Sequence, residues 1–175
     1  QGKGAAIKRG VEMASGDIIL FTDADVPFAY QTVLTMIKKL ESGCVFVMGD
    51  RNLPESNYNE EQSVMRRFAS RLFTKIVSRF FSHEHRDTQC GLKGFEAKLA
   101  KELFAALKTN GFAFDLEVIL RAQKQGIVID KIPVQERISN SMKKSSVRIW
   151  MHGPQMLWES FRIKRILRRD RAKSS

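Results

Sequence analysis

Apolar and polar positions alternate along the first fifty residues in a way that predicts helices and strands in turn. Alanine, valine and methionine gather around a short helix over 5–14, which Gly16 ends. The continuous apolar run within 17–23 predicts a strand buried on both faces, and 44–49 repeats that pattern. Residues 32–43, between the two strands, have the apolar spacing of an amphipathic helix.

The rest of the chain continues this alternation. Helical spacing recurs in four further segments: 61–82, 96–108, 114–126 and 150–169. Residues 126–134 predict another strand, in which Pro133 indicates an edge position or a strand end. Helices alternating with strands through short connections indicate an α/β fold, a largely parallel sheet flanked by helices.

Composition adds limits to this picture. A chain of 175 residues with 43% hydrophobic side chains has enough apolar surface for one globular domain with its own core. No apolar run approaches the roughly 18–20 residues that a membrane-spanning helix needs. Cys44 and Cys90 lie far apart and lack the spacing of a zinc site or a disulfide framework.

The net charge of +11 is concentrated in two segments. Residues 61–82 carry a net charge of +4 and residues 161–175 a net charge of +6. We therefore expect an anionic partner that meets these two segments. A binding module for nucleic acid or for an anionic membrane, without catalysis, is one interpretation. Aromatic residues make up only 9% and no known nucleic-acid-binding pattern occurs, so nucleic acid is not the expected partner.

The segment FTDADVPF at 21–28 places Asp23 and Asp25 directly after an apolar strand. Carboxylates there are costly unless their charge is compensated. Three interpretations fit the segment alone. The carboxylates could cap the next helix, or act as nucleophile and acid–base group as in haloacid-dehalogenase-type phosphatases. They could also hold Mg²⁺ or Mn²⁺ against the diphosphate of a nucleotide sugar.

The segments around this motif decide between the interpretations. Gly2-Lys3-Gly4 precedes it, and Gly49-Asp50-Arg51, DTQCGLKGF at 87–95 and FAFDLEV at 112–118 follow it. In this order they resemble the family-two, GT-A-type glycosyltransferases, and most closely the dolichyl-phosphate β-glucosyltransferases. The resemblance covers 1–170. It implies a GT-A (Rossmann-like) fold, with 1–146 as part of the catalytic domain and 147–175 as a basic amphipathic helix.

The resemblance also implies that a nucleoside-binding βαβ half precedes residue 1 in the family. The chain would then be the C-terminal portion of a catalytic domain. We expect the chain by itself to bind a uridine nucleotide poorly or not at all.

The same resemblance assigns roles on the donor side. Asp25 would be the direct metal ligand, and Asp23 would share the metal or contact the ribose or sugar. Lys3 would neutralise nucleotide charge, and Arg51 would lie near the donor phosphates, where its planar fork suits phosphate oxygens. Asp115 would be the general base of an inverting enzyme. Because a lipid phosphate is already anionic, Asp115 could instead orient sugar hydroxyls or the acceptor.

The residues alone leave plainer alternatives open for three of these side chains. Lys3 could be a solvated lysine at a helix start. Arg51 could pair with Asp50 or Glu55, and Asp115 could cap the helix over its own segment.

On the acceptor side, the resemblance implies contacts with lipid phosphate from residues in three segments: Arg66, Arg67, Gln89, Gly91 and Arg137. The first two lie on 61–82, whose phenylalanine-rich stripe faces away from a basic side. That pattern suits a helix in a lipid headgroup layer, although a core-packed helix with a solvated exterior has it too.

The resemblance therefore predicts a metal-dependent, inverting transfer of glucose from UDP-glucose to dolichyl or another polyprenyl phosphate at a membrane surface. The product would feed protein N-glycosylation or glycan assembly. The expected location is the cytoplasmic face of the endoplasmic reticulum, or of the plasma membrane in a bacterium, with the anchor outside this chain. Transfer of mannose from GDP-mannose is the alternative within the same enzyme class.

Overall fold

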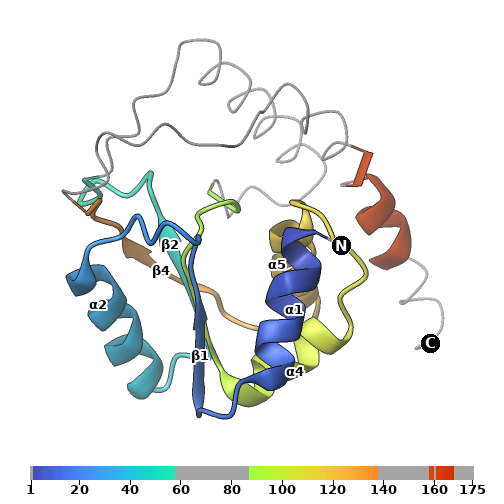
Figure 1. The fold of residues 1–175 in the computed structure, drawn as a ribbon, viewed down its shortest axis with the longest axis horizontal. Coiled ribbons are helices and arrows are strands. Elements are labelled where there is room, and N and C mark those ends of the chain that lie inside the picture. The colour runs from blue at the N-terminus through green and yellow to red at the C-terminus, as the bar shows by residue number, and fades with distance from the viewer. Residues whose placement is uncertain (1, 58–86, 138–157, 160, 168–175) are drawn as a thin grey trace, which may run out of the picture.

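The computed structural model describes residues 2–57, 87–137, 158–159 and 161–167 (Figure 1). Its regular elements are α1 (Lys3–Met13), β1 (Ile18–Phe21), α2 (Tyr30–Glu41), β2 (Phe46–Asp50), β3 (Lys93–Glu96), α4 (Ala97–Ala105), α5 (Phe114–Lys124) and β4 (Asp130–Pro133). Residues 161–167 are also helical. Each predicted helix or strand that falls on described residues is present, with bounds that differ by a few residues.

The described strands form one sheet in the order β1-β3-β2-β4. β2 and β4 are parallel, whereas β3 runs antiparallel to both of its neighbours. Three strands therefore share one direction, as predicted, but the sheet is mixed. β3 was not predicted, because Lys93 and Gly94 interrupt the apolar pattern of its four residues.

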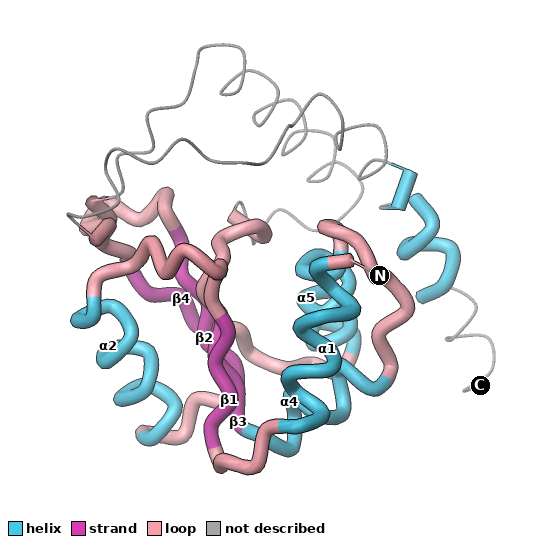
Figure 2. The backbone as a smooth tube through the Cα atoms, in the orientation of Figure 1, coloured by secondary structure: helices cyan, strands magenta, loops and turns pink. Residues whose placement is uncertain are grey.

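Helices cover both faces of the sheet, with α2 on one face and α1, α4 and α5 on the other (Figure 2). The larger core lies beneath the three helices, where the rings of Phe46 and Phe95 are 4.2 Å apart and Phe104 meets Phe95 edge-on. The smaller core joins Met36 and Leu40 of α2 to β2 and β4. Burial on both faces holds the sheet between two apolar layers.

The strands differ in how deeply they are buried. β1 is an outer strand of the described sheet, and only Ile19 of its four residues is fully buried. Ile19 and Phe21 pack on the larger core and Ile18 and Leu20 on the smaller one, so the expected burial on both faces is confirmed only in part. For β2 that expectation is confirmed, since all five residues are buried. Pro133 ends β4, the outer strand on the other side, as its missing N–H group predicts.

The predicted helix over 61–82 lies outside the described residues, as does most of the first half of the predicted helix over 150–169. No helix among the residues described is long and apolar enough to cross a membrane.

The strand directions gather the loops of interest at one edge of the sheet. The chain leaves β1, β2 and β4 at that edge, and because β3 runs the opposite way, the chain enters β3 there too. Helix α1, which precedes β1, begins near the same edge (Figure 1). Ligands of open α/β folds bind beyond the carboxyl ends of the strands.

Candidate active site at the carboxyl edge of the sheet

Asp23 and Asp25 lie in the loop that follows β1, the half-buried Asp23 nearer the strand and Asp25 exposed. The chain makes a tight turn from Asp23 to Val26, in which the Val26 N–H donates to the Asp23 carbonyl at 2.9 Å. Val26 has a φ of 45°, a value that a β-branched residue rarely adopts. Such strain is held only where the surrounding structure requires it.

Neither carboxylate caps the next helix. Helix α2 begins at Tyr30, its N-cap residue is Ala29, and no side chain bonds to its first N–H groups. The cap interpretation of FTDADVPF is therefore wrong.

Lys3 reaches Asp23 from the first turn of α1. Its Nζ lies 2.6 Å from Asp23 Oδ1 and 5.8 Å from the centre of the Phe114 ring, and the side chain is 27% exposed. Lys3 is therefore not simply a solvated lysine. Gly4 lets α1 begin here, because a Cβ at this position would lie 2.6 Å from the Thr109 carbonyl oxygen.

The 87–92 loop closes on Asp23 from the other side. A Cβ on Gly91 would overlap the Asp23 carboxylate, so any larger residue here would have to displace that carboxylate. The GKG and DTQCG segments lie far apart in the chain. Asp23 contacts both of them, the first through Lys3 and the second through Gly91.

Asp115 lies deeper, on the first turn of α5. Its Oδ1 is 2.7 Å from Nζ of Lys93, and the two side chains are 5% and 0% exposed. The contact is an ion pair between two buried side chains. Burial raises the pKa of Asp115, and the positive charges of Lys93 and Lys3 offset only part of that effect.

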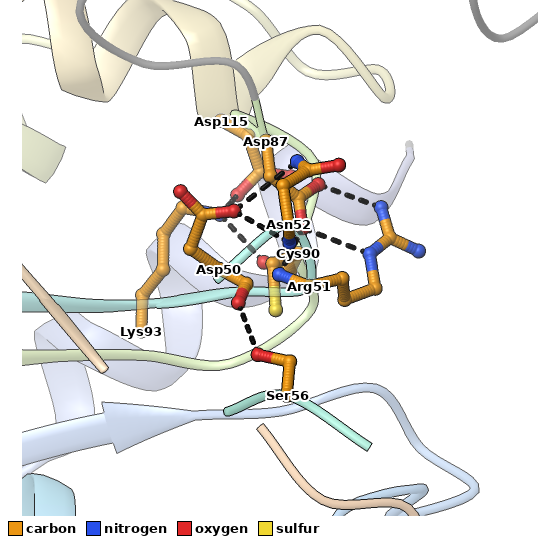
Figure 3. Close-up of polar contacts among 8 residues, drawn as sticks. All are labelled: Asp50, Arg51, Asn52, Ser56, Asp87, Cys90, Lys93 and Asp115. Atoms are coloured by element: carbon orange, nitrogen blue, oxygen red, sulfur yellow. Dashed lines mark hydrogen bonds and ion pairs between the residues drawn. The ribbon is translucent and has the colours of Figure 1, made fainter. Parts of the chain in front are cut away.

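The cap interpretation of Asp115 is also wrong. The N-cap residue of α5 is Ala113, and α5 has no side-chain cap. Asp115 instead points to the buried ammonium group on β3 (Figure 3).

Arg51 binds Asp87, a partner that the sequence analysis did not name. Its Nε and Nη2 donate to the two carboxylate oxygens at 2.9 and 2.7 Å, and its backbone N–H donates at 2.8 Å (Figure 3). Burial alone would raise the pKa of Asp87, but the hydrogen bonds and charge of Arg51 outweigh it and hold the pKa below its ordinary value. Asp50 instead accepts from Asn52 and lies 3.5 Å from Lys131.

Glu117, the last acid of FDLE, is buried completely and holds a neighbouring loop. It accepts the backbone N–H groups of Lys108 and Thr109 at 3.0 and 2.8 Å and the Nε of Arg121 at 2.8 Å. Asn110, next in that loop, accepts the N–H of Ala5 at 3.2 Å. The loop thus supports the start of α1. The role of Glu117 was not predicted, although an acidic residue on the apolar face of a helix indicates a buried polar contact.

The expected acceptor residues are spread along the same edge. Gln89 is half-buried, and its Nε2 finds no hydrogen-bond partner within the part of the chain that the structure describes. Arg137 is exposed, and its backbone N–H donates to the Pro27 carbonyl at 2.8 Å, beside the aspartate loop. Arg66 and Arg67 lie outside the described residues.

The donor atoms at this edge fit a hard divalent cation. Asp23 and Asp25 supply carboxylate oxygens, which Mg²⁺ and Mn²⁺ prefer, and Mg²⁺ typically takes one or two protein carboxylates together with substrate phosphates and water. Within the described ranges no three His, Cys, Asp or Glu side chains group as a metal site. A metal held by this pair would complete its coordination with phosphate oxygens and water.

Comparison with solved structures identifies the class of fold. The chain superposes on mannosyl-3-phosphoglycerate synthase from Rubrobacter xylanophilus with a TM-score of 0.65 and 21% identity, covering 97% of this chain and 52% of that one. It superposes on glucosyl-3-phosphoglycerate synthase from Mycobacterium tuberculosis, solved with UDP, with a TM-score of 0.64 and 16% identity, covering 93% and 55%. The fold is that of the GT-A glycosyltransferases.

Residues 1–104 match the family described as glycosyl transferase family 2, and the chain belongs to that family. This decides against the phosphatase interpretation of FTDADVPF. A dolichyl-phosphate beta-glucosyltransferase of Dictyostelium discoideum is 31% identical over 141 residues, and the human protein of that name is 31% identical over 146. Glycosyltransferase AglD of Haloferax volcanii is 28% identical over 173.

These matches cover 77%, 78% and 96% of this chain respectively. The chain spans 42% of each of the two dolichyl-phosphate relatives and 27% of the archaeal one.

Proposed function

We propose that the protein transfers glucose from UDP-glucose to dolichyl or another polyprenyl phosphate, with a divalent metal and inversion at the sugar carbon. One observation carries this proposal. Asp23 is contacted by Lys3 on one side and by Gly91 on the other, so the segments that resemble the family meet at one carboxylate. The relatives named dolichyl-phosphate beta-glucosyltransferase support the acceptor and the sugar.

Asp25 and Asp23 would hold Mg²⁺ or Mn²⁺. When bound, the metal supplies positive charge that stabilises the departing nucleotide diphosphate. Lys3 adds a further positive charge beside Asp23 and would neutralise donor phosphate. Mn²⁺ and UDP-glucose occur together in a solved structure of glucosyl-3-phosphoglycerate synthase from Mycobacterium tuberculosis, a protein of the same fold.

Arg51 would contribute to phosphate binding from the neighbouring strand end. Its guanidinium already makes two bonds to Asp87 and is 30% exposed. Asp87 thereby fixes the orientation of the Arg51 guanidinium, whose planar fork suits phosphate oxygens.

Asp115 would orient the reacting groups rather than take a proton. The proposed nucleophile is a lipid phosphate, which is anionic at neutral pH and needs no base. Asp115 is buried and paired with Lys93, so its carboxylate is held in one place, as an orienting group must be.

On the acceptor side, Gln89, Gly91 and Arg137 would face the lipid phosphate, together with Arg66 and Arg67 from the basic segment. The unpartnered Nε2 of Gln89 is a hydrogen-bond donor for such a ligand. A lipid acceptor places the enzyme at a membrane surface, which we propose to be the cytoplasmic face of the endoplasmic reticulum or a bacterial plasma membrane. The product would enter N-glycosylation or another glycan assembly.

The test supplies a full-length protein containing this chain with radiolabelled UDP-glucose, Mn²⁺ and dolichyl phosphate. We expect a labelled lipid-linked sugar, and its loss in Asp25→Ala. Asp17→Ala is the matched control, because Asp17 is an exposed carboxylate at the opposite end of β1 and should keep activity. Absence of product, or equal product from Asp25→Ala, refutes the proposal.

The same assay with labelled GDP-mannose tests the alternative donor. Preference for GDP-mannose would replace glucose by mannose in the proposal and leave the enzyme class unchanged. A binding module without catalysis predicts no transfer from either donor.

A further inference from the structure

Lys93 is a fully buried charge within the sheet, and the sequence analysis gave it no role. Its side chain is 0% exposed, among the largest that are completely buried in the described residues. An apolar side chain on β3 would avoid the desolvation cost of an ammonium group. A lysine at this buried position therefore indicates a role beyond filling space in the core.

The contacts of Lys93 join three parts of the chain. Its Nζ donates to the Cys90 carbonyl at 2.8 Å and lies 2.7 Å from Asp115 Oδ1 (Figure 3). The ring centre of Phe21, the last residue of β1, is 5.8 Å away. One cation thus ties the 87–92 loop to the first turn of α5, beside the end of β1.

The 87–92 loop is held at both ends. Arg51 binds Asp87 at its start, and Lys93 binds Cys90 near its end. Between these points Gly91 lies so close to Asp23 that a Cβ would overlap Oδ2. The position of this loop therefore limits where the Asp23 carboxylate can lie.

We propose that Lys93 is a positioning residue, which ties the 87–92 loop to α5, keeps Gly91 against Asp23 and so fixes the Asp23 carboxylate. Direct contact between Lys93 and a substrate is excluded by its complete burial. The consequence for sugar transfer rests on the function proposed above, whereas the effect on the loop does not.

Cys90 reports on the loop without any activity assay. It is one of two cysteines in the chain, so Cys44→Ser leaves it as the only thiol. Cys90 is 0% exposed, and burial raises the pKa of its thiol to about 11. In the folded 175-residue chain, an aromatic disulfide reagent should therefore modify it slowly.

Lys93→Met removes the cation and keeps a side chain of similar length. In the Cys44→Ser background we expect Cys90 to react about tenfold faster or more, because the loop opens locally, while the circular dichroism of the fold persists. Lys131→Met is the matched control. Lys131 lies in the same row of the sheet, since Met48 pairs with Lys93 on one side and Lys131 on the other.

An unchanged Cys90 rate in folded Lys93→Met overturns the proposal, and so does an equal rise in Lys131→Met. Lys93→Met leaves Asp115 buried without its partner, and the variant could fail to fold for that reason. The double variant Lys93→Met/Asp115→Leu removes both charges. It should fold and still open the loop, and a protected Cys90 in this variant refutes the proposal.

The catalytic consequence is measured in the full-length enzyme. Lys93→Met should raise the Mn²⁺ concentration for half-maximal transfer, and Lys131→Met should not; equal Mn²⁺ dependence in all three proteins contradicts the link to Asp23. Absence of transfer by the parent enzyme would refute the proposed function but leave the thiol result to decide on the loop.

Discussion

Arg51 hydrogen-bonds to the Asp87 carboxylate through both its backbone N–H and its guanidinium group, with donor–acceptor distances of 2.7 to 2.9 Å. The pair joins the end of β2 to the start of the 87–92 loop, 36 residues further along the chain. Asp87 is only 6% exposed, so the two charges attract each other with little solvent between them.

Loss of this pair should destabilise the protein in a pH-dependent way. The pKa of Asp87 is lower in the folded protein than its ordinary value, so its contribution is complete above about pH 4 and declines as the pH falls through the folded pKa. At neutral pH, Asp87→Asn should lower the free energy of unfolding by about 1.5–3 kcal/mol, the range for hydrogen bonds to a charged group. Urea unfolding at a series of pH values measures this.

The difference between Asp87→Asn and the parent should shrink in acid. Asp130→Asn is the control, because Asp130 meets the more exposed Lys39 at 3.3 Å and should cost about 0–1 kcal/mol. A constant difference at all pH values would contradict the assignment to Asp87.

Gly91→Ala should impair the site without unfolding the protein. The added methyl group overlaps the Asp23 carboxylate and must displace it. We expect transfer by the full-length enzyme to fall and its Mn²⁺ requirement to rise. Gly10→Ala is the control, since a Cβ there meets nothing within 4 Å and should stabilise α1 by about 0.5–1 kcal/mol. Normal Mn²⁺ dependence in Gly91→Ala would show that Asp23 does not need its observed position.

Val26→Gly should relieve backbone strain in the aspartate loop. Glycine adopts a φ of 45° freely, whereas valine does so at a cost of about 1–3 kcal/mol. The greater freedom of glycine in the unfolded chain offsets about 0.4–1 kcal/mol of that gain. Thermal unfolding should therefore show Val26→Gly at least as stable as the parent, whereas Val128→Gly, at another exposed valine, should be less stable. If Val26→Gly lost as much thermal stability as Val128→Gly, the proposed backbone strain at Val26 would be disproved.

Glu117→Ala should be strongly destabilising. It leaves the nearly buried Arg121 and two loop N–H groups without their acceptor, a change that costs about 3–5 kcal/mol. Glu102→Ala removes an exposed acid bonded to Gln125 and should change stability by about 0.5 kcal/mol or less. Equal effects of the two substitutions in urea unfolding would contradict the buried role of Glu117.

Periodicity predicted the described helices well, because each has an apolar face that packs on the sheet. It failed for β3, where a buried lysine and a glycine occupy a central strand. Both residues are explained by contacts outside the strand. Lys93 forms an ion pair with Asp115, and Gly94 leaves space for side chains of α2. No pattern within four residues carries that information.

The candidate site was foreseen in part. The motifs located Asp23, Asp25, Lys3 and Asp115, and the structure brings three of these into one charged cluster. The partners of Arg51 and Asp115 were missed, because an ion pair between residues more than twenty positions apart depends on strand order, which the sequence alone did not provide.

The segment FTDADVPF separates what the sequence determines from what the tertiary structure determines. The sequence by itself determined that two carboxylates follow an apolar strand and that the surrounding segments belong to one family. Only the tertiary structure decided what the Asp23 carboxylate contacts: it lies between Lys3 and Gly91. The reason is the direction of β3, which runs against β1 and thereby brings the DTQCG loop to the edge where the aspartates lie.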